Sequence, residues 1–243
     1  MRRDDALFWL VTYTERHGMG ADRSLFTDIN HLSAATGWAH GFMAAYALWG
    51  GLVALTVVWA ACWLVARRAD DVRSLAGVIL TGVAAVLALG INQIIGPLVD
   101  RPRPFVAMPH VLLLLPHSAD PSFPSDHAII AGAFVGGLVV VSRRWGTLAA
   151  VLALFLAFAR VYVGVHYPTD VAGGLLIGAL VGLLLVSSNA RTLLARPLAG
   201  LAGTPLRPVL TAAPPRPVPA KPEPTMPADP ARWSDTPTGG RHR

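Results

Sequence analysis

Three segments of the chain carry side chains that together could bind and attack a phosphoryl group: residues 101–104, 122–127 and 160–170. Arginine presents a planar fork of N–H donors that matches phosphoryl oxygens, and it keeps its charge. Arg103 and Arg160 are therefore candidate phosphate clamps. An isolated Arg-Pro pair at a membrane edge is often only a loop anchor, so the hypothesis depends on the three segments occurring together.

The middle segment has the composition of a helix start. Pro124 and Ser125 precede an apolar run, and the free N–H groups and dipole of a helix N-terminus favour a bound anion. The Ser125 hydroxyl adds a further donor. His127, two residues on, would lie in the first turn, where it could act as a general acid for a leaving oxygen.

The last segment supplies a nucleophile and a carboxylate that could orient it. His166 ends one stretch, Pro168 breaks the helix, and Asp170 opens the next stretch. A carboxylate held against one ring nitrogen fixes the tautomer and leaves the other nitrogen able to attack. No compact cluster of histidines and carboxylates demands a metal ion, so we expect neither a metal nor a cofactor.

Long charge-free runs must position these segments: 29–66, 74–99, 128–142, 145–159 and 171–190. A membrane-spanning helix needs about 20 residues, so the first run makes one span with a lead-in. The third and fourth runs are short and must extend to Ser125 and beyond Arg160, which places both residues at the membrane boundary. The predicted fold class is all-α, an integral membrane helical bundle of five spans, or six if residues 1–36 also cross.

Glycines recur four residues apart in two of the predicted helices. Gly132 and Gly136 lie in one, and Gly174, Gly178 and Gly182 lie in the other. In lipid this spacing lets helix backbones approach closely, so we interpret these glycines as packing residues.

Arginines in the short connections predict the orientation. They follow the first span, join the third span to the fourth, and follow the last: Arg67, Arg68, Arg73, Arg143, Arg144, Arg191 and Arg196. In a five-span protein these positions share one side, which the positive-inside rule makes cytoplasmic. Residues 100–127 and 160–170 then face outward, so we expect a multi-pass protein of the cell membrane with its site on the extracytoplasmic face.

Three regions follow from this division. Residues 1–36 form an N-terminal interfacial segment, residues 37–190 form the membrane-embedded domain, and residues 191–243 form a Pro-rich, disordered cytoplasmic tail. Of the formal net charge of +6, most comes from residues 190–243, which hold eight basic and three acidic side chains. The body is nearly neutral, so we expect no nucleic-acid partner. The oligomeric state is left open.

The order and spacing of the three segments resemble the type 2 phosphatidic acid phosphatase family. Its motifs are Lys-x6-Arg-Pro, Pro-Ser-Gly-His and Ser-Arg-x5-His-x3-Asp, and this chain matches them at Arg103-Pro104, at Pro124-Ser125 with His127, and at Arg160, His166 and Asp170. The resemblance implies that His166 attacks phosphorus, that Asp170 orients it and that His127 protonates the leaving group. It also implies that Arg103, Ser125 and Arg160 hold the phosphoryl oxygens, without a metal.

The chain departs from the motifs at three positions. The family lysine falls at Gly96, the motif glycine is Asp126, and the serine before Arg160 is Ala159. We expect Arg101 to substitute for the lysine, and we include Asp126 among the residues at the phosphate.

The Pro-Ser-Asp-His form of the second motif resembles the bacterial undecaprenyl diphosphatases of the bacitracin-resistance type. The resemblance implies a lipid phosphate as substrate, with undecaprenyl diphosphate converted to the monophosphate carrier used in cell-wall synthesis. Two alternatives stay open. One is a phosphatidate or phosphatidylglycerophosphate phosphatase, and the other is a non-catalytic lipid-phosphate binder or transporter.

Overall fold

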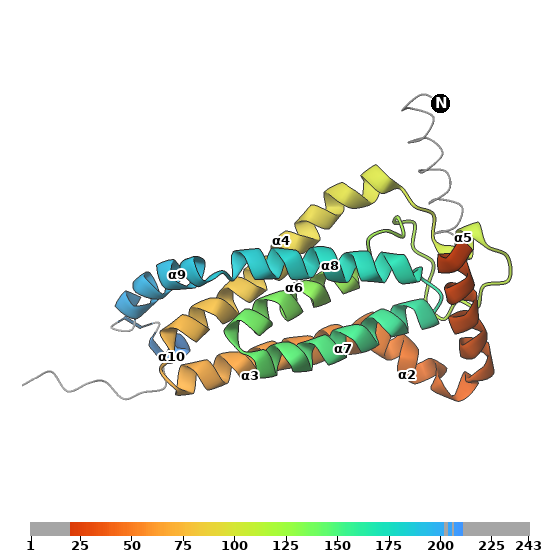
Figure 1. The fold of residues 1–243 in the computed structure, drawn as a ribbon. Coiled ribbons are helices and arrows are strands. Elements are labelled where there is room, and N and C mark those ends of the chain that lie inside the picture. Colours follow the sequence, from red (N-terminus) through yellow and green to blue (C-terminus); the bar gives the residue numbers. More distant parts are fainter. Residues whose placement is uncertain (1–19, 202–203, 206, 211–243) are drawn as a thin grey trace, which may run out of the picture. The chain divides into compact units, whose positions relative to one another are not determined.

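The computed structural model describes residues 20–201, 204–205 and 207–210, and the regular structure within them is entirely helical (Figure 1). Residues 20–35 form the first described helix, and the N-terminal residues 1–19 lie outside the described part. The elements that follow are η1 (Gly37–Ala39), α2 (His40–Ala45), η2 (Tyr46–Gly50), α3 (Gly51–Arg68), α4 (Val72–Val99), α5 (Pro104–Ala107), α6 (Asp126–Val141), α7 (Arg143–Tyr162), α8 (Pro168–Leu185), α9 (Ser188–Leu201) and α10 (Arg207–Leu210).

Four helical stretches of the described residues are long and apolar enough to cross a membrane: Gly37–Arg68, Val72–Ala107, Arg143–Tyr162 and Pro168–Leu185. The first contains η1, α2, η2 and α3, so the long apolar run at 29–66 gives one span with a lead-in, as predicted. The protein is therefore an integral membrane protein with an all-helical fold.

Helix α6 is the shortest of the five predicted spans. It has 16 residues, which at 1.5 Å per residue extend about 24 Å, less than the roughly 30 Å hydrocarbon core of a bilayer. More than half of its residues are buried, on all sides of the helix, among them Ile129, Ala133 and Leu138. A helix that is apolar all round is a core helix, and α6 packs between α4, α7 and α8.

The glycines of α6 and α8 bring these two helices into backbone contact. A methyl group at Gly178 would overlap the main-chain oxygen of Ile129, and one at Gly136 would overlap that of Ala179. The interpretation of the four-residue spacing as packing is thus confirmed. The close approach also joins the starts of the two helices, since the Ser125 N–H donates to the main-chain oxygen of Asp170 at 3.2 Å.

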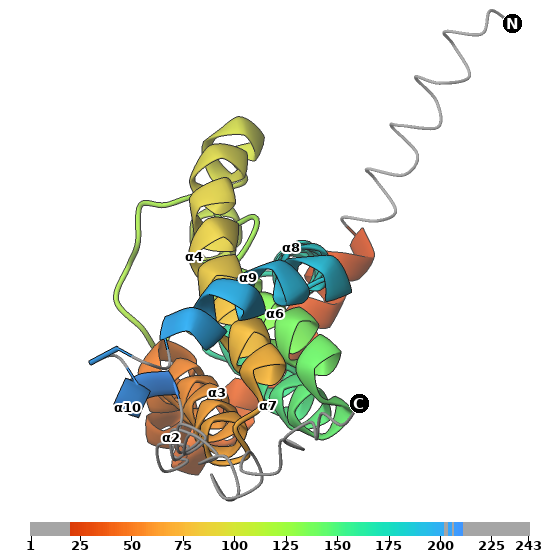
Figure 2. The ribbon, with the colours of Figure 1, turned by 90° about the vertical axis from the view of Figure 1, so that its left-hand side faces the viewer.

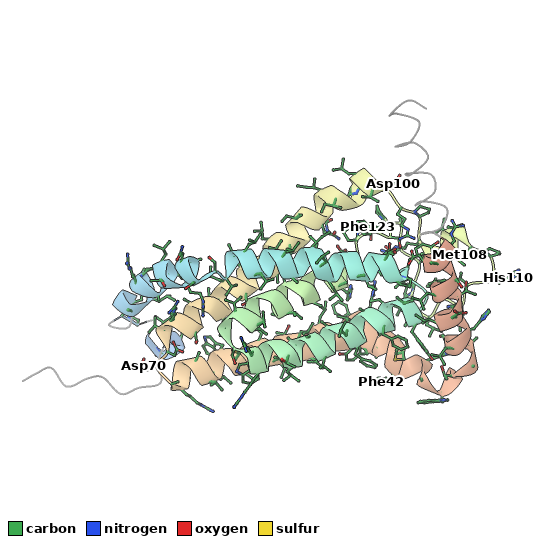
Figure 3. The ribbon with its side chains drawn as sticks, in the orientation of Figure 1. Phe42, Asp70, Asp100, Met108, His110 and Phe123 are labelled. Atoms are coloured by element: carbon green, nitrogen blue, oxygen red, sulfur yellow. The ribbon has the colours of Figure 1, made fainter. Side chains whose placement is uncertain are left out.

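The two ends of the bundle hold different segments of the chain. Asp70, in the turn between α3 and α4, marks one end, and Asp100, Met108, His110 and Phe123 mark the other (Figure 3). The second end contains the starts of α6 and α8, the ends of α4 and α7, and the loops between them. Helix 20–35 lies at this end, at a steep angle to α6, α7 and α8 (Figure 1).

Helix α4 is inclined to the rest of the bundle, as two perpendicular views show (Figures 1 and 2). Its N-terminal half packs against α9, where Leu75 and Ala76 form a buried cluster with Leu198. Residues 191–201, which we assigned to the disordered tail, therefore belong to a helix that packs on the bundle. The helix forms because Leu194, Ala195 and Leu198 recur on one face. The tail beyond residue 210 lies outside the described residues.

Candidate active site

A cavity of about 440 Å³ opens at the end of the bundle where α6 and α8 begin. Four elements contribute polar side chains to its lining: α4, the loop before α6, the start of α6, and the segment from the end of α7 to the start of α8. The polar lining residues are Asn92, Gln93, Arg103, Ser118, Asp120, Asp126, His127, Arg160 and His166. The cavity thus brings together five of the eight residues that the sequence predicted.

His166 lies at the base of this cavity, in the turn between α7 and α8, and is 1% exposed. Its Nδ1 lies 2.8 Å from the main-chain oxygen of Ser122. A carbonyl oxygen can only accept, so Nδ1 carries the hydrogen, and Nε2 presents its lone pair. Arg160 Nη2 donates to that Nε2 at 3.2 Å. The ring is thereby held in the tautomer that a nucleophilic Nε2 requires.

Burial keeps the His166 imidazole neutral. Loss of solvation lowers its pKa to about 3, and the charges of Arg160 and Arg103 act in the same direction, against the raising effect of Asp170. At neutral pH the ring is unprotonated and able to attack an electrophile.

Asp170 is fully buried at the first turn of α8, but it is not in direct hydrogen-bond contact with His166. Its Oδ2 lies 3.8 Å from His166 Nδ1, and accepts instead from the Ser122 hydroxyl at 2.5 Å and the Tyr167 N–H at 2.8 Å. The predicted tautomer is present, but the Ser122 carbonyl takes the position that we expected for the carboxylate. The reason is that Ser122 contacts both side chains, with its hydroxyl bonded to Asp170 and its carbonyl to His166.

The two arginines of the cavity are each anchored to main-chain oxygens. Arg103 is anchored by its Nε to the main-chain oxygen of Asp120 at 2.8 Å and by Nη1 to that of Val165 at 3.3 Å. Arg160 Nη1 donates to the main-chain oxygen of Ala47 at 3.2 Å. Its Nε is buried without a hydrogen-bond partner among the described residues.

Ser125 immediately precedes α6, as its sequence predicted, and is fully buried. Within the described part of the chain its hydroxyl has no hydrogen-bond partner either. Buried polar atoms without partners are rare and call for an explanation. The orphaned donors of Ser125 and Arg160, beside the start of α6, are what an anion-binding site provides.

His127 lines the cavity from the first turn of α6. Its Nε2 lies 3.0 Å from the main-chain oxygen of Leu48, so Nε2 carries a hydrogen and Nδ1 is the nitrogen that can exchange a proton. Leu48 and Ala47 belong to η2, a single π-helical turn. Such turns often occur at functional sites. Here the same turn supplies the Leu48 carbonyl to His127 and the Ala47 carbonyl to Arg160.

Asp126 borders the cavity and accepts a hydrogen bond from Asn92 Nδ2 at 2.5 Å. The same Nδ2 donates to the main-chain oxygen of Pro124 at 3.1 Å. Asn92 therefore ties α4 to the loop that begins α6. Gly96, where the family lysine would fall, also borders the cavity. Among the described residues, α4 therefore contributes no cation to its lining.

Arg101 does not take the place of that lysine. It is not among the residues that line the cavity, and its guanidinium pairs with Asp22 and Asp170, each at 2.6 Å. Both amino groups of its guanidinium thus donate to carboxylates. The cations at the cavity within the described residues are Arg103 and Arg160.

Several residues of this site were not predicted from the sequence: Asp22, Ala47, Leu48, Asn92 and Ser122. Asn92 gave a usable signal, because an amide inside a charge-free membrane run is costly and is commonly functional. Asp22 and Ser122 gave none, and the contacts of Ala47 and Leu48 are made by the main chain. The other histidines of the described residues do not line the cavity: His31, His40, His110 and His117.

The fold and the cavity define a membrane-embedded helical enzyme with two histidines, two arginines and a buried carboxylate at one end of the bundle. Residues 75–192 match the model of the PAP2 superfamily, and the chain is 36% identical over 143 residues to undecaprenyl-diphosphatase BcrC of Bacillus subtilis. That match covers 59% of this chain and 69% of the relative. The chain belongs to the PAP2 superfamily, and it is a hydrolase of phosphoric esters or anhydrides.

The chain is also similar to a second relative and to one solved structure. The chain is 34% identical over 144 residues to the bacitracin transport permease protein BcrC of Bacillus licheniformis, covering 59% of this chain and 67% of the relative. The crystal structure of a transmembrane PAP2-type phosphatidylglycerolphosphate phosphatase from Bacillus subtilis superposes with a TM-score of 0.52 at 22% identity, over 74% of this chain and 90% of that one. At this identity the structural match concerns the fold alone.

Proposed function

We propose that this protein hydrolyses a polyprenyl diphosphate, preferably undecaprenyl diphosphate, to the monophosphate through a phosphohistidine at His166. The observation that carries the proposal is the state of His166: a buried, neutral ring whose Nδ1 donates to Ser122 and whose Nε2 accepts from Arg160. His166 lines the cavity together with Arg103 and Arg160. Mere binding of a headgroup needs cations, but it needs neither an oriented nucleophile nor a nearby acid.

In the first half of the reaction His166 Nε2 attacks the terminal phosphorus. The bond from that phosphorus to the bridging oxygen breaks. His127, which takes up a second proton at Nδ1 when the negatively charged diphosphate binds, gives that proton to the departing polyprenyl phosphate. The guanidinium groups of Arg103 and Arg160, the Ser125 hydroxyl and the N–H groups at the start of α6 stabilise the charge that builds on the phosphoryl oxygens.

In the second half a water molecule attacks the phosphohistidine. His127, now neutral at Nδ1, takes a proton from the water, the bond between phosphorus and Nε2 breaks, and inorganic phosphate leaves with the lone pair restored to Nε2. Arg160 exchanges its contact with Nε2 for one with a phosphoryl oxygen while the phosphoenzyme exists. No metal takes part in either half.

The preference for a polyprenyl diphosphate rests on two points. The Pro124-Ser125-Asp126-His127 sequence has the form found in the bacitracin-resistance type, and the relative from Bacillus subtilis is named an undecaprenyl-diphosphatase. A phosphatidylglycerophosphate substrate is the second candidate, since the Bacillus subtilis phosphatase with a similar fold is named for that lipid. We place the cavity on the extracytoplasmic face because the arginine-rich connections lie at the opposite end of the bundle.

The test is phosphate release by purified protein in detergent with a chelator present, from undecaprenyl diphosphate and from phosphatidylglycerophosphate. The proposal requires chelator-resistant release that favours the diphosphate and is lost in His166→Ala. Equal or greater release from the glycerophospholipid would change the substrate but keep the mechanism. Release that survives in His166→Ala would remove the phosphohistidine, and no release from any lipid would favour a binding protein.

A further inference from the structure

Helix 20–35 lies outside the segment that matches the family model, yet one of its carboxylates reaches the start of α8. Asp22 is 6% exposed. Its two oxygens accept from the Thr169 N–H at 3.0 Å, from the Thr169 hydroxyl at 2.7 Å and from Arg101 Nη2 at 2.6 Å. Three donors converge on one buried carboxylate, so its position is fixed.

Arg101 passes this constraint on to Asp170. Its Nη1 donates to Asp170 Oδ1 at 2.6 Å and to the Thr169 hydroxyl at 2.7 Å. The guanidinium lies over the Tyr167 ring, 4.1 Å from its centroid, and Phe26 of helix 20–35 packs against the same ring at 5.5 Å. The arginine is held at both amino groups and on one face.

Asp170 depends on this arginine for its charge balance. The carboxylate is fully buried, and the neighbouring His166 is neutral. Within the described residues, the charge of Asp170 is balanced by its ion pair with Arg101. A buried carboxylate that loses its cation either takes up a proton or moves. Either change would disturb the Ser122 oxygens through which Asp170 orients His166.

We propose that Asp22 and Arg101 are positioning residues that act on His166 through Asp170, and that helix 20–35 is part of the active site. The proposal rests on the function proposed above. It predicts separate effects on kcat and on KM. Because neither Asp22 nor Arg101 lines the cavity, their loss lowers kcat and leaves KM unchanged, whereas loss of a phosphate ligand raises KM.

The experiment compares Asp22→Asn, Arg101→Gln and the double variant, each normalised to its folded fraction. The control is Asp28→Asn, the same chemical change at an exposed position of the same helix. We expect Asp22→Asn to lower kcat about tenfold, as for loss of one hydrogen bond to a charged group, with KM within about twofold. The double variant is no slower than Arg101→Gln, because both residues act on the same carboxylate.

A second readout keeps this proposal separable from the choice of substrate. Orthovanadate mimics the five-coordinate phosphorus of the attack, and its binding is measured as a rise in melting temperature that grows with concentration. Asp22→Asn raises the apparent vanadate Kd about tenfold while Asp28→Asn leaves it unchanged. If wild type binds vanadate in this way but hydrolyses no diphosphate, the substrate proposal fails and the positioning network stands.

Three results would overturn the inference. The first is an Asp22→Asn enzyme with wild-type kcat and vanadate affinity. The second is a loss of folded protein in that variant with full activity per folded molecule, which would make Asp22 a structural residue. The third is an Arg101→Gln enzyme with raised KM and unchanged kcat, which would return Arg101 to the phosphate. A wild type that neither hydrolyses lipid phosphates nor binds vanadate would end both proposals.

Discussion

The Nδ1 atom of His166 is hydrogen-bonded to the main-chain oxygen of Ser122 at 2.8 Å, and the hydroxyl of the same serine donates to Asp170. Ser122 is thus the link between His166, the proposed nucleophile, and the Asp170 carboxylate. The direct distance from Nδ1 to Asp170, 3.8 Å, is too long for a hydrogen bond. The Ser122 carbonyl thus fixes the tautomer of His166, while the Asp170 charge acts through the serine hydroxyl. In a histidine bound directly to a carboxylate, one group would do both.

Replacing Ser122 by alanine removes the hydroxyl link but keeps the carbonyl that holds His166. We expect kcat to fall about tenfold, the effect of one lost hydrogen bond to a charged group, with little change in KM. Ser188→Ala, at the start of α9, also loses a hydroxyl that is hydrogen-bonded to a charged side chain, that of Arg73; because Ser188 does not line the cavity, it is the control. An unchanged kcat in Ser122→Ala would show that Asp170 acts on His166 without the serine.

The low pKa of His166 predicts how stability changes with pH. An unfolded histidine titrates near 6.5, and burial lowers the folded value to about 3. Between these values the unfolded chain binds a proton that the folded chain does not, so the free energy of unfolding falls as the pH drops from about 6.5 toward 3. Above about pH 7 this contribution is constant.

The measurement is the difference between wild type and His166→Gln in urea unfolding at pH 4.5 and pH 7.5. The variant cannot take up a proton at this position, so we expect it to lose less stability on acidification than wild type does. Equal losses in the two proteins would place the folded pKa of His166 near its ordinary value.

The guanidinium of Arg160 uses several of its nitrogens at once, which a lysine ammonium cannot do. It contacts Ala47 with Nη1 and His166 with Nη2, and its Nε is unpaired. Lysine keeps the charge but loses the fork, so Arg160→Lys should lower kcat/KM roughly a hundredfold, about two lost charge-assisted hydrogen bonds. Arg143→Lys, at the opposite end of α7, should leave it unchanged, and a mild effect at Arg160 would argue that only its charge matters.

The contact between α6 and α8 makes a prediction about stability. A methyl group at Gly178 would overlap the Ile129 carbonyl, which belongs to the main chain and cannot rotate away. We expect Gly178→Ala to cost about 1–3 kcal/mol and to lower the melting temperature in detergent. Gly90→Ala, where the added methyl meets no atom within 4 Å, is the control and should be neutral or slightly stabilising.

The fold followed from the sequence wherever a signal was repeated along the chain. Charge-free runs gave the positions of α3, α4, α7 and α8, and glycine spacing gave the contact between α6 and α8. Helix α9 was missed because its apolar face, Leu194 to Leu198, is short and lies beside the first prolines of the tail. A short face of this kind becomes stable only through the packing surface that α4 offers.

The site was predictable where chemistry needs a particular side chain, as at His127, Arg160 and His166. It was not predictable where the main chain does the work, as with the carbonyls of Leu48 and Ser122, because sequence does not display carbonyl directions. Arg101 was misread for a related reason. An arginine beside a phosphate motif is equally suited to a carboxylate, and only the position of Asp22, far away in sequence, decides between them.

The most direct measurement is isolation of the phosphoenzyme. Purified protein is mixed with undecaprenyl diphosphate labelled in its terminal phosphate, quenched within milliseconds, and digested for identification of the labelled residue. The mechanism predicts an acid-labile, alkali-stable phosphate on His166, absent in His166→Ala and present at normal amplitude, but formed more slowly, in Asp22→Asn. Lipid hydrolysis that proceeds at full rate with no label on His166, or with label on another residue, would contradict the account.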